Sequence, residues 1–214
     1  MFFPYKDDNP RILVPYVTYG IIGLNILIFL FQVGLGQTNQ NLILHFGLIP
    51  AHWSLISLFT SMFLHGGFAH LLGNMWFLWL FGDNVESALG HVRYLIFYFL
   101  CGIGAAVAQT TINLDSTIPM VGASGAISGV LAAYMIQYPK ARVHVFMFLF
   151  IFFTTFRVPA FVVIGFWFLE QLTNGLGSIG LDISGGVAWF AHIGGFIAGA
   201  GLIKLNPLIR IEKI

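Results

Sequence analysis

The sequence predicts an all-α polytopic membrane protein: a single membrane domain over residues 1–214, built as a six-transmembrane-helix bundle with a long interfacial first loop. The first observation is composition, since 58% of the 214 residues are hydrophobic and 8% are charged, against about 25% charged residues in soluble domains. The other observations are a set of apolar stretches of membrane-spanning length and a one-sided distribution of Lys and Arg. A chain this apolar must expose hydrophobic side chains, so lipid is the expected solvent.

The spans follow from length and hydropathy. Each one needs about 20 predominantly apolar residues, because a helix rises about 1.5 Å per residue. The first 15 residues are charged and proline-rich and lack an apolar core, so no cleavable signal peptide is expected and the first apolar stretch is retained as a span. The expected spans are residues 16–34, 68–85, 92–112, 121–138, 158–174 and 188–205.

Two further apolar stretches do not fit a span. Residues 36–66 are interrupted by polar, Gly and Pro positions, and we expect them to form a long loop in the membrane interface. Residues 143–156 are dominated by aromatic and aliphatic side chains but are short, which favours an interfacial or re-entrant segment over a crossing.

The distribution of Lys and Arg sets the expected orientation. If residues 143–156 do not cross, all nine Lys and Arg residues fall on one side of the membrane, and the loops 36–66, 113–120 and 175–187 contain none. The positive-inside rule then predicts that both termini are cytoplasmic. The nine residues are Lys6, Arg11, Arg93, Lys140, Arg142, Arg157, Lys204, Arg210 and Lys213.

Polar residues inside the predicted spans are costly in lipid, so each calls for a partner or a function. His70 and Asn74 are four residues apart and share one face of the second span. Ser124 lies just inside the fourth span, and His192 lies just inside the sixth. These three spans all enter from the outer face, so His70, Ser124 and His192 are expected at similar depth in the outer third of the bilayer.

Small residues surround both Ser124 and His192. Residues 122–125 read Gly-Ala-Ser-Gly and residues 191–195 read Ala-His-Ile-Gly-Gly. Small residues allow close helix approach, which could bring a hydroxyl and an imidazole within about 2.6–3.2 Å. The structural alternative is that the glycines are packing seams, the serine bonds the carbonyl four residues earlier, and the histidine is a satisfied core group.

These motifs resemble the rhomboid family of intramembrane serine proteases. Gly122-Ala123-Ser124-Gly125 matches the family's GxSG, residues 191–195 match its AHxGG, and residues 70–74 match its HxxxN. Glu86 and Gly90 resemble a further ExxxG pattern, and residues 58–67 are also similar to bacterial rhomboids. The resemblance covers about residues 53–205 and implies a rhomboid-like bundle.

Two positions depart from the family. Some members carry a Trp-Arg pair in the first loop, where this chain has Ile56-Ser57. Some members place an aromatic residue under the imidazole four positions after the serine, where this chain has Ser128. The sequence therefore leaves open how the ring of His192 is held.

The resemblance implies acyl transfer by a catalytic dyad. Ser124 is expected to be the nucleophile and His192 the base and acid, without a carboxylate, because Asp182 lies in a loop and Glu170 lies on another span. The oxyanion is expected to be stabilised by the side chains of His70 and Asn74 together with backbone groups at Gly122 and Ser124.

The same reading predicts the setting of the reaction. The expected partners are the lipid bilayer and substrates that are single-span membrane proteins, with Gly, Pro or small residues near the outer end of the span. The protein is expected in a prokaryotic inner membrane, with an active site that opens to the outer face. A movable cap is expected at residues 175–187. The aromatic side chains of the fifth span could form a lateral gate, although lipid-facing packing is the simpler interpretation. Glu86 is expected to tie a cytoplasmic loop to a helix end.

Other functions fit the sequence less well. No cofactor and no metal are expected, because the chain has one cysteine and no HExxH motif, and the net charge of +1 gives no indication of nucleic-acid binding. An inactive rhomboid-like protein that binds membrane helices remains an alternative, although such relatives usually lose the serine or the histidine. A transporter would predict an internal repeat, which the sequence does not display. The sequence does not set the oligomeric state.

Overall fold

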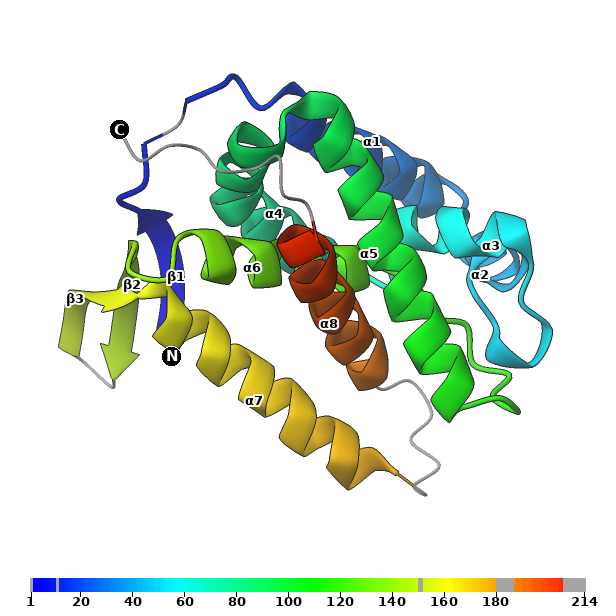
Figure 1. The fold of residues 1–214 in the computed structure, drawn as a ribbon. Coiled ribbons are helices and arrows are strands. Elements are labelled where there is room, and N and C mark those ends of the chain that lie inside the picture. Colours follow the sequence, from blue (N-terminus) through cyan, green and yellow to red (C-terminus); the bar gives the residue numbers. More distant parts are fainter. Residues whose placement is uncertain (1, 11, 150–151, 180–186, 206–214) are drawn as a thin grey trace.

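The computed structural model describes residues 2–10, 12–149, 152–179 and 187–205. A helix occupies each of the predicted spans, with ends that shift by a few residues (Figure 1). These helices are α1 (Tyr16–Gly34), α4 (Phe68–Leu89), α5 (His91–Ile112), α6 (Ser124–Gln137), α7 (Ala160–Ser178) and α8 (Trp189–Leu205).

Length and composition single out fewer crossing helices than the six predicted. Within the described residues, α1 and α5 are each long and apolar enough to span a bilayer, and α4 becomes a third when joined to the helical segment before it across a 90° bend. The helices α6 and α8 are apolar but shorter. The count of six crossings therefore stays a prediction.

The first loop is more ordered than the sequence predicts. It contains short helical segments, one of which begins with a capping box in which Ser54 and Ser57 exchange hydrogen bonds. Its chain also pairs with the segment before α6, since Leu48 and Met120 exchange backbone hydrogen bonds of 3.0 and 2.8 Å. The helical segments are η1 (Gly36–Thr38), α2 (Asn39–Phe46), η2 (Pro50–His52), α3 (Leu55–Thr60) and η3 (Ser61–Phe63).

A three-stranded antiparallel sheet corrects the all-α prediction. Its strands are β1 (Phe2–Asp7), β2 (Arg142–Leu149) and β3 (Phe152–Pro159), in the order β1-β2-β3. The stretch 143–156 therefore forms paired strands, and its expected position in the membrane interface stays a prediction. Its aromatic and β-branched residues favour strands, and the third strand comes from the far N-terminus, a pairing that local sequence cannot reveal.

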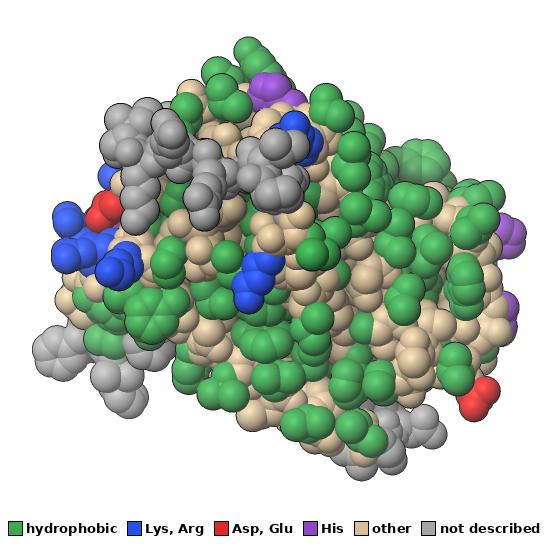
Figure 2. Space-filling model, viewed as in Figure 1, with side chains coloured by type: hydrophobic (Ala, Val, Ile, Leu, Met, Phe, Trp, Pro, Cys, Tyr) green, Lys and Arg blue, Asp and Glu red, His purple; other side chains and the backbone are tan. Residues whose placement is uncertain are grey.

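The hairpin returns the chain to the side from which it left, because Arg142 lies opposite Pro159 in the register and His144 lies opposite Arg157. The two arginines therefore lie at one end of the molecule, as the charge pattern requires. Figure 2 shows a group of Lys and Arg side chains beside the sheet and others apart from it over the helices, where much of the surface is hydrophobic. Arg11, Arg210 and Lys213 fall outside the described residues.

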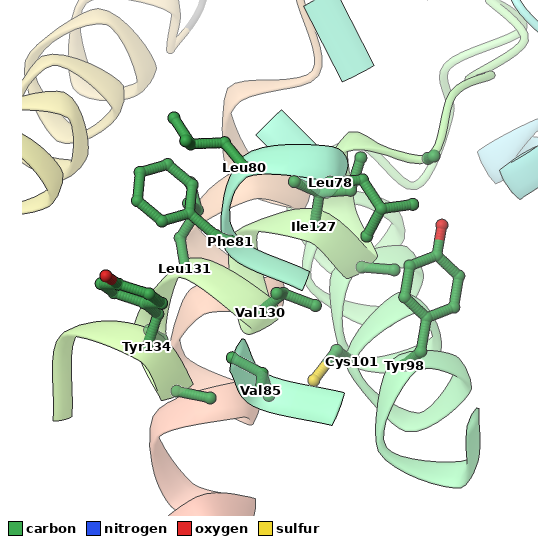
Figure 3. Packing of buried hydrophobic residues seen from close by; sticks show 14 of the residues in the cluster. Leu78, Leu80, Phe81, Val85, Tyr98, Cys101, Ile127, Val130, Leu131 and Tyr134 are labelled. Atoms are coloured by element: carbon green, nitrogen blue, oxygen red, sulfur yellow. The ribbon is translucent and has the colours of Figure 1, made fainter. Parts of the chain in front are cut away.

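The helix α6 lies at the centre of the bundle, packed against α4, α5 and α8 (Figure 1). Every residue from Gly125 to Tyr134 is buried. Figure 3 shows Val130 and Leu131 of α6 in one cluster with Phe81 of α4 and Cys101 of α5. Because α6 is surrounded by other helices and no face of it meets solvent, it has no polar face.

Glu86 ties α4 to the start of α1, so its structural role holds a helix end as predicted, but Glu86 itself lies within a helix and not in a loop. Its buried carboxylate accepts the backbone N–H groups of Val17 and Thr18 at 2.9 and 2.8 Å and the Thr18 hydroxyl at 2.7 Å. His91 lies 2.6 Å from the same carboxylate. A negative charge at a helix N-terminus satisfies otherwise free N–H groups and complements the helix dipole.

The N-terminal strand carries Asp7 into the end of the bundle. The Tyr134 hydroxyl and the Asn84 amide both donate to its carboxylate. Burial raises the pKa of Asp7 from 3.8 to about 6; the hydrogen bond from Tyr134 opposes this shift and the nearby Asp83 carboxylate adds to it. The folded protein therefore holds this proton up to a higher pH than the unfolded chain does.

The contribution of Asp7 to stability is accordingly expected to fall as the pH rises from about 4 to 6, because the unfolded state releases this proton first. Asp7→Asn should flatten that dependence and stabilise the protein at pH 7 by about 1 kcal/mol. This is less than the full pKa shift of Asp7 implies, because the side chain is partly exposed and solvent screens its charge. Thermal midpoints in detergent across this pH range test it, with Asp115→Asn as the control. An Asp7→Asn profile identical to the parent's would contradict the expectation.

Candidate active site

Ser124 is the first residue of α6, and Gly122 shapes the turn that precedes it. Gly122 has φ of 123°, a conformation that side chains rarely adopt. A Cβ atom there would also lie 2.7 Å from the His70 ring. The Gly122 N–H donates to the Ser61 carbonyl at 2.9 Å, which fastens this turn to the first loop. Glycine is therefore required both by the backbone and by the space left for His70.

His192 lies in the first turn of α8 and faces Ser124. Its Nε2 is 2.8 Å from the Ser124 Oγ, and its side chain is buried. Glycines on α8 allow it to lie this close to α6. Cβ atoms at Gly195 and Gly199 would lie 1.9 and 2.4 Å from α6 backbone atoms, so a larger residue at either position would push the two helices apart. The structure thus brings together the two residues that the sequence singles out most strongly.

The predicted oxyanion residues lie on α4 beside this pair. The Asn74 Nδ2 donates to the His70 carbonyl at 3.0 Å, so the amide is held on the same face as the imidazole. The Gly66 N–H donates to the His70 Nδ1 at 3.4 Å, which leaves Nε2 as the protonated ring nitrogen. Both side chains can therefore present N–H donors.

These four side chains line one cavity of about 790 Å³, a volume in the usual range for ligand sites. The cavity walls also include Met120 from the segment before α6 and Trp167 from α7. A second hollow of about 460 Å³ shares wall residues with it, among them Met120, and is lined by polar side chains such as Gln109 and Asn113.

Gln171 is the residue of the site that sequence reasoning missed. It lies on α7, and its Oε1 is 2.7 Å from the Nδ1 of His192. The sequence leaves the ring's orientation open, and the usable signal was a polar side chain within an apolar span. Glu170, the residue before it, is exposed, and Asp182 lies outside the described residues.

Aromatic contacts to the imidazole come from elements other than α6. The rings of Trp167 and Trp189 have centroids 5.9 and 6.3 Å from that of His192. Ser128, which stands where some rhomboids have an aromatic residue, donates its hydroxyl to the Ser124 carbonyl at 2.6 Å. The intrahelical serine bond weighed as a structural alternative is thus made by Ser128, and the Ser124 hydroxyl faces His192.

The predicted cap and gate are only partly described. Gly175 and Gly177 of the predicted cap belong to α7, and residues 180–186 lie outside the described residues. Phe161 and Phe166 are exposed on α7, which fits lipid-facing packing.

Comparison with known families matches residues 52–206, more than half of the chain, to the Rhomboid domain. Rhomboid protease GluP of Bacillus subtilis is 34% identical over 193 residues, covering 88% of this chain and 35% of GluP. Rhomboid protease AarA of Providencia stuartii is 31% identical over 223 aligned positions, covering 92% of this chain and 74% of AarA.

Rhomboid protein 1, mitochondrial, of Saccharomyces cerevisiae is 28% identical over 206 residues, covering 92% of this chain and 54% of the yeast protein. The chain therefore spans about a third of GluP and about half of the yeast protein. The matched domain, the identities and the apolar helices lead to one conclusion: this chain belongs to the rhomboid family of integral membrane proteins.

Proposed function

We propose that this protein is an intramembrane serine endopeptidase that cleaves transmembrane segments through a dyad of Ser124 and His192. The observation that carries the proposal is the 2.8 Å contact between the Ser124 Oγ and the His192 Nε2, on the wall of a cavity large enough for a peptide segment. A hydroxyl paired with an imidazole in this way is the arrangement that nucleophilic acyl transfer requires.

Acylation proceeds by attack of the Ser124 Oγ on a peptide carbonyl carbon, while the His192 Nε2 accepts the hydroxyl proton. The tetrahedral intermediate then collapses, and His192 delivers the proton to the leaving amine. The product is an acyl-enzyme on Ser124. Water then attacks the acyl carbonyl carbon while His192 accepts a proton from it, and His192 returns that proton to the Ser124 Oγ as the acyl bond breaks and the carboxylic acid product leaves.

The developing oxyanion is stabilised by the N–H donors of His70 and Asn74 and by the backbone N–H of Ser124, which is at a helix N-terminus. The N–H of Gly122 already donates to Ser61. We therefore assign to Gly122 the role of shaping the turn and leaving room for His70, and its use as an oxyanion donor would require that hydrogen bond to break.

Water for deacylation has a polar route in the second hollow, whose Asn113, Asp115 and Ser116 belong to the segment between α5 and α6. Ser124 begins α6, and the basic sheet follows the other end of that helix. If the basic end is cytoplasmic, as the positive-inside rule predicts, the site opens toward the outer leaflet.

The expected substrates are membrane proteins with a single transmembrane helix that opens locally near its outer end. An intact helix hides its carbonyl groups in backbone hydrogen bonds, so a serine cannot attack it. Gly, Pro or other weak helix formers near the outer end lower the free energy of that opening.

The test uses a fluorophosphonate probe, which reacts with an activated serine. The detergent-solubilised parent protein is expected to be labelled and Ser124→Ala to remain unlabelled, with thermal midpoints showing that both are folded. If this protein only binds helices and has no activated serine, the parent will not be labelled. An unlabelled parent, or equal labelling of the parent and Ser124→Ala, would overturn the proposal.

A further inference from the structure

Gln171 reaches the catalytic imidazole from a helix that carries neither Ser124 nor His192. Its side chain is 3% exposed, and its Oε1 lies 2.7 Å from the His192 Nδ1. Its Nε2 donates to the Trp167 carbonyl, one turn earlier on α7, at 3.2 Å. Both ends of the buried amide are thus engaged.

The second hydrogen bond fixes which way the amide faces. A backbone carbonyl can only accept, so the amide nitrogen must lie toward Trp167 and the amide oxygen toward His192. Because that oxygen can only accept, the His192 Nδ1 must carry a proton. A neutral imidazole carries a single N–H, so its Nε2 presents a lone pair to the Ser124 hydroxyl.

This is the tautomer that a general base needs. The opposite tautomer would direct an N–H at Ser124 and could not accept the hydroxyl proton. The same contact also limits rotation of the ring, which Trp167 and Trp189 flank in tilted and edge-on geometry. Position 128 of α6 holds a serine, which has no ring to stack on the imidazole, so the orientation of the His192 ring depends on contacts from α7.

We propose that Gln171 is a positioning residue that holds His192 as the Nδ1–H tautomer, in the place where a triad has a carboxylate; this rests on the proposed function. A neutral amide orients the ring without adding a buried charge, which would be costly at this depth. Since Gln171 lies on α7, this helix has to remain against α8 during proton transfer.

The kinetic test compares Gln171→Met with Leu169→Met, a matched control because Leu169 is exposed on the same helix. With a reporter substrate, kcat of Gln171→Met is expected to fall about 10- to 100-fold with KM nearly unchanged, because binding groups remain while the ring loses its orientation. The control should keep the parent's kcat. An unchanged kcat in Gln171→Met would overturn the proposal.

Gln171→Glu separates positioning from simple packing. It keeps an acceptor at the His192 Nδ1, so much of the rate should return relative to Gln171→Met. Its carboxylate also stabilises the imidazolium, so the acidic limb of the pH–rate profile should move to higher pH. Activity as low as that of Gln171→Met across the whole pH range would contradict a positioning role.

A spectroscopic readout is independent of proteolysis. In protein labelled with ¹⁵N-histidine, the signals missing from His192→Ala identify that ring, and the parent should show a protonated Nδ1 whose population falls in Gln171→Met. A parent ring protonated at Nε2 would refute the inference. If the parent resists the fluorophosphonate probe but shows the expected tautomer, the protease proposal fails while the positioning role stands.

Discussion

His192→Ala is expected to lower the cleavage rate of a reporter with one transmembrane segment by about 10⁴-fold or more, while the protein stays folded. The imidazole is the group within hydrogen-bond distance of the Ser124 hydroxyl that can accept its proton, at 2.8 Å. Without that base, the attacking oxygen must lose its proton to water, and the leaving amine receives no proton from the enzyme. Cleavage in detergent or in proteoliposomes, measured by appearance of the product fragment, checks the expectation.

His45→Ala provides the matched control, because His45 is an exposed histidine of α2 outside the cavity. Its cleavage rate should equal that of the parent. His192→Ala loses the hydrogen bonds to Ser124 and Gln171 and the ring contacts with two tryptophans. Its thermal midpoint should therefore fall by several degrees, while a cooperative unfolding transition remains. A His192→Ala variant that cleaves at the parent's rate would remove His192 from the mechanism.

Gly195→Val is expected to be the most damaging packing substitution, lowering the free energy of unfolding by about 3 kcal/mol and removing activity. A Cβ atom at position 195 would lie 1.9 Å from the Gly125 carbonyl oxygen, far inside van der Waals contact. That oxygen belongs to the backbone of the central helix, so α8 must move away from α6. The shift would also separate His192 from Ser124, which lie on these two helices.

Gly201→Val tests whether the effect comes from this contact or from valine in a helix. Gly201 is on the same helix, and a Cβ atom there would meet nothing within 4 Å. Its unfolding midpoint and fluorophosphonate labelling should stay close to the parent's. Equal losses in both variants would show that the approach of α8 to α6 is not what holds the site together.

Local sequence predicted the helices well, because hydrophobic length is a local property. A helix lies over each expected span, although α6 begins at Ser124, a few residues after the expected start. Local sequence could not predict the sheet, since β1 pairs with a strand more than a hundred residues away along the chain. The aromatic run at 143–156 is recognisable as apolar from its sequence, but its strand partners became known only from the structure.

The candidate site divides in the same way. Motif and depth arguments from the sequence alone singled out Ser124, His192, His70 and Asn74, because polar groups are conspicuous in an apolar chain. Which of them touch, and through which atoms, depends on how α6 and α8 are rotated and how closely their glycine faces meet. The sequence therefore determined which residues are available for chemistry.

Only the tertiary structure decided how the imidazole is held. Gln171 is polar and lies in a predicted span, but nothing in its local sequence says that α7 turns this side chain toward α8. The contact joins residues on different helices, so it follows from helix rotation and packing and not from periodicity. The candidate reacting groups can thus be identified along the chain, whereas their orientation exists only once the helices have packed.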